Sequence, residues 1–92
     1  MLEISTIVKK SIRQVSCEFN DEVVLLQLDR GRYFGLQTVG AAIWNGLAEP
    51  RPIADICDDV LAQFDVAPTV CKDHVIKFLT RLQSVGLIEV AG

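Results

Sequence analysis

The spacing of apolar residues changes once along this chain, and the change restricts the folds that the chain can adopt. Residues 13–36 form short segments that alternate between apolar and polar side chains or are rich in valine and leucine, as β-strands are. From residue 39 onward, apolar side chains recur every three or four positions, which is the period of an amphipathic helix. A length of 92 residues allows one domain. We therefore expect a single α+β domain over residues 1–92, with a sheet followed by helices.

Three short strands joined by tight turns are predicted in the first part of the chain. Residues 13–19 alternate, the pair Asn20-Asp21 marks a turn, and residues 22–28 favour a second strand. The segment Asp29–Gly31 marks another turn before a third strand over residues 32–36. Consecutive strands joined in this way form a three-stranded antiparallel meander with two free edges. The alternation predicts that the first strand is half-buried, with Val15, Cys17 and Phe19 on its apolar face.

Three helices are predicted after the sheet. The first runs from Val39 to Leu47, and the hydroxyl of Thr38 is expected to cap it. The segment Glu49–Pro52 ends this helix because proline cannot continue the hydrogen-bond ladder. An apolar stripe then predicts a second helix from Ile53 to Phe64.

The third helix is predicted from Thr69 to Val85, where Gly86 can end it in a left-handed conformation. Residues Leu87–Val90 fit a short final strand or an extended tail. The last two helices, joined by a short connector and accompanied by the meander, favour a winged helix-turn-helix-like arrangement.

Charge, the length of the apolar runs and the spacing of the cysteines argue against nucleic-acid binding, membrane insertion and a zinc site. The net charge of −3 argues against non-specific binding to nucleic acid, which needs a cationic surface. No apolar run approaches the roughly 18 residues of a membrane span, and the lysines of Met1–Lys10 follow the apolar residues, unlike those of a secretory signal. We therefore expect a cytoplasmic protein without a membrane partner. The three cysteines contain no CxxC pair, so we expect buried thiols rather than a zinc site, and no cofactor.

The sequence offers little for catalysis. It has neither a nucleophile elbow nor a glycine loop that could hold a phosphate. Cys71 and His74 lie three positions apart on one predicted helix and could face each other. We interpret them as an incidental pair on the helix surface, so a cysteine hydrolase is the least favoured of three hypotheses. The basic residues Lys72, Lys77 and Arg81 on the third predicted helix keep a second hypothesis open, a winged-helix regulator that binds DNA.

The run from Leu28 to Trp44, LDRGRYFGLQTVGAAIW, resembles the central signature of the PqqD-like family. The run from Val75 to Ile88, VIKFLTRLQSVGLI, is similar to the closing helix of that family, and the resemblance extends over residues 15–90. It implies a winged-helix-like fold without catalysis of its own. It also implies that the protein binds the leader segment of a ribosomally synthesised precursor peptide and presents it to a separate enzyme.

The resemblance implies that the leader joins the third strand as an added strand, with its side chains in a cleft toward the third helix. The GRYFGL…IW form is more similar to the free-standing leader-binding proteins of lasso-peptide clusters than to PqqD of quinone-cofactor synthesis, although another class of modified peptide stays open. The partner enzyme would be a leader peptidase or other modifying enzyme, and the protein a monomer or weak homodimer. The residues to which the resemblance assigns peptide binding are Arg32, Tyr33, Phe34, Gly35, Leu36, Lys72, Val75, Ile76, Leu79, Thr80 and Gln83.

Overall fold

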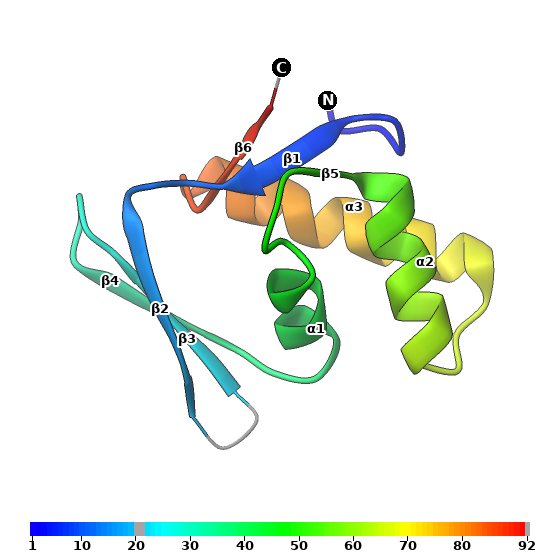
Figure 1. Ribbon diagram of the computed structural model, residues 1–92, viewed down its shortest axis with the longest axis horizontal. Coiled ribbons are helices and arrows are strands. Elements are labelled where there is room, and N and C mark those ends of the chain that lie inside the picture. Colours follow the sequence, from blue (N-terminus) through cyan, green and yellow to red (C-terminus); the bar gives the residue numbers. More distant parts are fainter. Residues whose placement is uncertain (20–21, 92) are drawn as a thin grey trace.

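The computed structural model describes residues 1–19 and 22–91, without the side chain of Phe19, and shows an α+β fold (Figure 1). Within these residues, two three-stranded antiparallel sheets accompany three helices. The predicted turn at Asn20-Asp21 lies outside the described residues. In chain order the elements are β1 (Ile7–Lys10), β2 (Gln14–Phe19), β3 (Glu22–Gln27), β4 (Arg32–Leu36), α1 (Val39–Asn45), β5 (Arg51–Pro52), α2 (Ile53–Gln63), α3 (Pro68–Ser84) and β6 (Ile88–Val90).

The predicted meander is confirmed as the sheet β2–β3–β4. Its strands are antiparallel, and the register pairs Leu25 with Phe34 and Leu26 with Tyr33. Facing residues of neighbouring strands share a side of the sheet. The side that carries Leu25 is turned toward the core, because that side chain is fully buried.

The expectation that the first strand is half-buried, with its apolar face covered, is wrong for the two apolar residues of that face whose side chains are described. Val15 is 55% exposed, and Cys17 is also exposed. The register explains this, because Val15 faces Leu26 and therefore lies on the outer side of the sheet. An alternating pattern shows that two faces differ, but it does not show that another element covers the apolar one.

The second sheet, β5–β1–β6, was not predicted as a sheet. Strand β1 lies at its centre and pairs antiparallel with β5 on one side and with β6 on the other. Of the two possibilities for Leu87–Val90, a short strand or an extended tail, the structure shows a strand, β6. With four residues in β1 and two in β5, these strands are too short to show a period in the sequence.

The three helices agree with their predicted ranges to within one or two residues. The predicted cap at Thr38 is wrong. Its backbone adopts φ 51° and ψ −114°, not the extended conformation usual for a cap, and its hydroxyl makes no capping hydrogen bond. The left-handed end at Gly86 is confirmed by a φ of 79°. There, Gly86 N–H donates to Gln83 O and Leu87 N–H donates to Leu82 O, which is the Schellman pattern.

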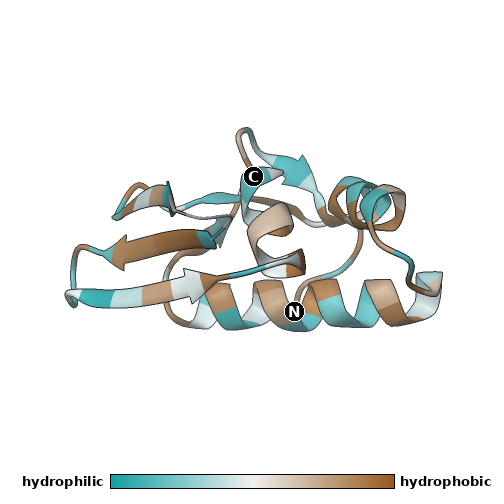
Figure 2. Cartoon of the chain, turned by 90° about the horizontal axis from the view of Figure 1, so that it is seen from below, coloured by the Kyte–Doolittle hydropathy of each residue, from teal (hydrophilic) through white to brown (hydrophobic). Residues whose placement is uncertain are grey.

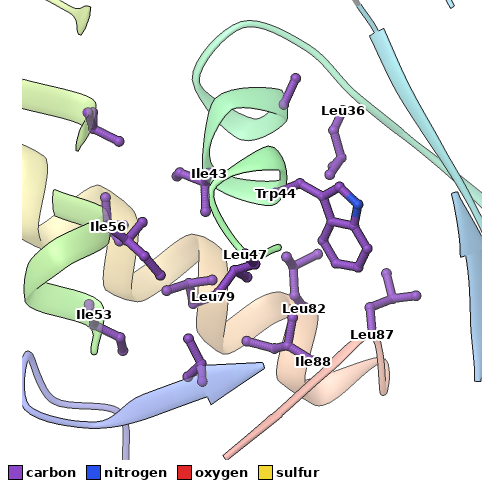
Figure 3. Close-up of a cluster of buried hydrophobic side chains, with 14 of the residues drawn as sticks. Leu36, Ile43, Trp44, Leu47, Ile53, Ile56, Leu79, Leu82, Leu87 and Ile88 are labelled. Carbon is purple, nitrogen blue, oxygen red and sulfur yellow. The ribbon is translucent and has the colours of Figure 1, made fainter. Parts of the chain in front are cut away.

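A single apolar core joins the helices to both sheets (Figure 3). Trp44 projects from α1 toward Leu82 of α3 and Leu87, and it is only 1% exposed. The ammonium group of Lys10 lies 4.7 Å from the centre of its ring, and burial lowers the pKa of that lysine. The stripe of α3 that enters the core consists of Cys71, Val75, Leu79 and Leu82. In the described part of the chain, no helix has the length and apolar character needed to cross a membrane.

Candidate functional site

Strand β4 forms one edge of the meander. Among the described residues it pairs with β3 alone, so its other edge carries backbone N–H and C=O groups without a strand partner. Seen from below, this edge is the side of the sheet nearest to α3 (Figure 2). An extended segment of another chain could pair with it.

A pocket of about 340 Å³ lies beside this edge. It is bordered by strand β4 and the turn after it, by α1 and by α3, so the consecutive elements β4 and α1 form it together with a helix that is distant in sequence. Most of the wall is apolar, with the imidazole of His74 exposed at the border. Its lining residues are Gly35, Leu36, Gln37, Val39, Gly40, Ile43, His74 and Phe78.

The contact between α1 and α3 sets the width of the pocket. A Cβ atom on Gly40 would lie 3.2 Å from Cζ of Phe78, which is closer than ordinary van der Waals contact. The absence of a side chain at Gly40 therefore allows the ring of Phe78 to approach α1. Ile43, on the same helix, is 2% exposed and closes the inner end of the pocket.

The meander is joined to the C-terminal end of α3 by a buried side chain. Gln27, at the end of β3, is 5% exposed, and its Nε2 donates a hydrogen bond to the backbone carbonyl of Val85. Gln27 faces Arg32 of β4 in the register, so the first residue of β4 is close to the same end of α3. Between Leu36 and Arg32, the edge of β4 therefore runs from the middle of α3 toward its C-terminal end.

The structure assigns the β4 residues to two sides of the sheet. Phe34 is half-buried and packs against the core, whereas Tyr33 points outward and is 74% exposed. The resemblance assigned both aromatic residues to the site, and the register places Phe34 on the inner side of the sheet and Tyr33 on the outer side. Gly35 and Leu36 border the pocket, and Arg32 is exposed at the far end of the strand.

The predicted residues of α3 are not brought together beside β4. Val75 and Leu79 are 1% and 0% exposed and belong to the core. Lys72 and Ile76 border two other pockets of about 360 Å³ each. One of these lies against the N-terminal segment Leu2–Ser5. The predicted positions Thr80 and Gln83, also exposed, lie on this same side of α3.

Two residues that border the β4 pocket, His74 and Phe78, were not assigned to the site from the sequence. Their spacing of four positions places them on one side of the helix, next to the buried stripe. The glycine at position 40, within a helix of small residues, was the other available signal, because it allows close packing at the point where α3 crosses α1.

A larger hollow of about 520 Å³ lies between the meander, α1 and the end of α2. Its border includes the carboxylates of Glu18 and Glu22, and the second of these accepts a hydrogen bond from Gln37. The β4 residues that carry the free edge do not border it, so it does not extend the site described above.

The arrangement of Cys71 and His74 does not form a nucleophile–base pair. The thiol of Cys71 is 2% exposed and its Sγ lies 3.7 Å from Cys57 O, whereas His74 is exposed beside β4. The neighbouring Cys57 is not a better nucleophile, because burial raises the pKa of its thiol and thus disfavours the reactive thiolate. Within residues 1–19 and 22–91, no three His, Cys, Asp or Glu side chains lie close enough to bind a metal ion together.

The basic residues of α3 do not form one stripe. Lys72 and Arg81 are separated by nine positions, or about two and a half turns, and therefore lie on opposite sides of the helix. Lys77 is paired with Asp73 at 3.0 Å.

An ion pair outside the candidate site connects β5 to α2. Arg51 donates a hydrogen bond to the carboxylate of Asp59 and lowers the pKa of that group.

Comparison with known proteins identifies the family. Residues 22–88 match the family of coenzyme PQQ synthesis protein D, PqqD. TbiB1, solved in complex with the TbiA(beta) leader peptide, is 37% identical with a TM-score of 0.84, over 91% of this chain and 98% of TbiB1. Lasso peptide synthetase B1, complexed with the leader peptide, has a TM-score of 0.79 at 20% identity, over 89% of this chain and 96% of that one, and shows the shared fold. No curated protein is similar enough to be matched. Since the family match spans most of the chain, and TbiB1 supports it at 37% identity, this protein belongs to the PqqD family.

Proposed function

We propose that this protein binds the leader segment of a ribosomally synthesised precursor peptide, of the lasso-peptide class, by adding it as a strand to the edge of β4. The observation that carries the proposal is an edge of β4 that has no strand partner among the described residues and lies beside an apolar pocket. The similarity to TbiB1, which was solved with a leader peptide, supports it.

Recognition would combine backbone pairing, which is independent of the peptide's sequence, with burial of side chains, which depends on it. The free N–H and C=O groups of β4 supply hydrogen bonds that do not depend on the peptide's side chains. Alternate side chains of an added strand point inward, and the pocket at Phe78 accepts one apolar side chain. Buried anchors of this kind carry most of the free energy of binding in protein interfaces.

The role that we propose is capture without catalysis. The bound leader would be delivered to a separate leader peptidase or other modifying enzyme in the cytoplasm. The pair α2–α3 and the meander would correspond to the helix-turn-helix and wing of a winged-helix domain that binds peptide instead of DNA. The division of the basic side chains between opposite sides of α3 supports peptide as the ligand.

The proposal is tested by fluorescence anisotropy with two labelled probes: the TbiA(beta) leader, with which TbiB1 was solved, and the leader of a candidate precursor sought among the neighbouring genes. Each leader is compared with its scrambled sequence. We expect binding of at least one true leader and of neither scrambled peptide. Amide hydrogen exchange in the complex should show new protection within Arg32–Leu36.

Failure of the folded protein to bind either leader would contradict leader capture. Binding without new protection in β4 would leave capture in place and exclude strand addition at this edge. Gel-shift binding to duplex DNA, lost steeply as salt is raised, would support the regulator instead.

A further inference from the structure

The two ends of the cleft between β4 and α3 differ in charge. At one end, the pocket is walled by apolar side chains and bordered by His74. At the other end lie two arginines. Arg32 begins β4 and faces Gln27, whose amide bonds to Val85 at the end of α3. Arg81 lies one turn before Val85 and on the same side of the helix as Phe78.

Both arginines are available to a ligand. Arg32 and Arg81 are exposed, and neither takes part in any of the ion pairs found within the described residues. The carboxylate nearest to Arg32 in sequence, that of Asp29, already pairs with Arg13 at 3.1 Å. The cleft therefore presents two uncompensated positive charges in a chain whose net charge is −3.

We infer that Arg32 and Arg81 form an acidic-side-chain subsite, so that the peptide bound here carries an aspartate or glutamate beside its apolar anchor. This inference rests on the proposed function and adds a chemical requirement to it. A guanidinium group presents paired donors to a carboxylate, which gives orientation as well as attraction.

The geometry of the cleft also fixes the spacing of the two features. Arg32 and Leu36 are four positions apart on β4, and Arg81 lies about one turn after Phe78, toward the C-terminal end of α3. A strand added to β4 advances by about 3.3 Å per residue, as β4 itself does. Its side chains that point to one face recur every second residue, so the acidic residue lies about two to four positions from the apolar anchor.

The test is selection from a display library of random linear peptides against the intact folded protein. The wild type is compared with the variant R32Q/R81Q. A matched control, K9Q/K77Q, removes the same charge from two lysines that are already paired with Glu89 and Asp73. We expect the wild type and the control to enrich peptides with an apolar anchor and an acidic residue at the stated spacing. The variant should keep the anchor and lose the acidic preference.

A selected peptide then supplies a quantitative check. Replacing its acidic residue by the corresponding amide should weaken binding to the wild type by about threefold to tenfold, since partly exposed ion pairs contribute modestly. The same replacement should leave binding to R32Q/R81Q unchanged. An acidic preference that survives in R32Q/R81Q, or peptides selected for the anchor alone, would overturn the inference and leave peptide capture intact. Selection of no peptide by the folded protein would instead contradict the proposed function.

Discussion

The two sides of α3 differ in what they face, although both flank the same buried stripe. One side, with His74 and Phe78, borders the free edge of β4. The other, with Lys72 and Ile76, borders the N-terminal segment. Both sides contain apolar and polar residues and are bordered by pockets of similar volume. A helix surface thus becomes a candidate peptide site through the element opposite it, here a strand with unpaired backbone groups, more than through its own composition.

The largest expected effect comes from truncating a residue of the buried stripe of α3, because the positions of both sides of the helix depend on how that stripe packs. Leu79 is fully buried, so L79A should lower the free energy of unfolding by about 2–5 kcal/mol through lost burial and a residual cavity. Urea denaturation followed by circular dichroism measures the change. Q83A, at an exposed position of the same helix, is the control and should stay within about 0.5 kcal/mol. A similar loss in both variants would show that α3 is not anchored as described.

A second variant pair compares the two sides directly. Phe78 and Ile76 are both half-buried, but only Phe78 borders the pocket beside β4. F78A should weaken leader binding by about thirtyfold, or ~2 kcal/mol, because it removes a wall of the anchor pocket. I76A should change binding less than twofold. Anisotropy titration measures both, after circular dichroism has shown that each variant is folded.

The exposed residue His74 provides a further check on the same side, because H74A does not remove a core side chain. It should weaken binding more than I76A does. If I76A has the larger effect, the peptide contacts the side of α3 that carries Lys72 and Ile76, the two residues that the sequence-based assignment included in the site.

The smallest expected effect concerns the join between α3 and the meander. Gly86 has a φ of 79°, and a Cβ atom there would lie 3.2 Å from Nε2 of Gln27. G86A should therefore lower the free energy of unfolding by about 1 kcal/mol, since alanine is strained in this conformation. G35A is the control, because nothing lies within 4 Å of a Cβ at Gly35. Equal stability of the two variants in urea would argue against a constrained helix end.

Much of the fold follows from local patterns in the sequence. The meander and the helices were predictable because each has its own period or turn signal, and the left-handed end at Gly86 follows from glycine's conformational freedom. The sheet β5–β1–β6 was not, because it is made of short strands brought together from both ends of the chain. The exposure of Val15 depends equally on what packs against the sheet, which no local pattern encodes.

The candidate site divides in the same way. The edge strand Arg32–Leu36 was predictable from its turn and its length, and the structure confirms those bounds. The period of α3 identifies its buried stripe, but it does not distinguish between the two sides of the helix that flank the stripe. Which side meets β4 is decided by the contact of Phe78 with Gly40 and by the bond from Gln27 to Val85, both between residues far apart in sequence.

These two contacts have a consequence for the rate at which a peptide would bind. They hold the cleft near its two ends in the free protein, so the slot exists before a peptide arrives. Association into such a slot needs no slow opening step and should fall in the usual range of about 10⁵–10⁷ M⁻¹s⁻¹. Different peptides would then have similar association rate constants, and their affinities would differ mainly through their dissociation rates.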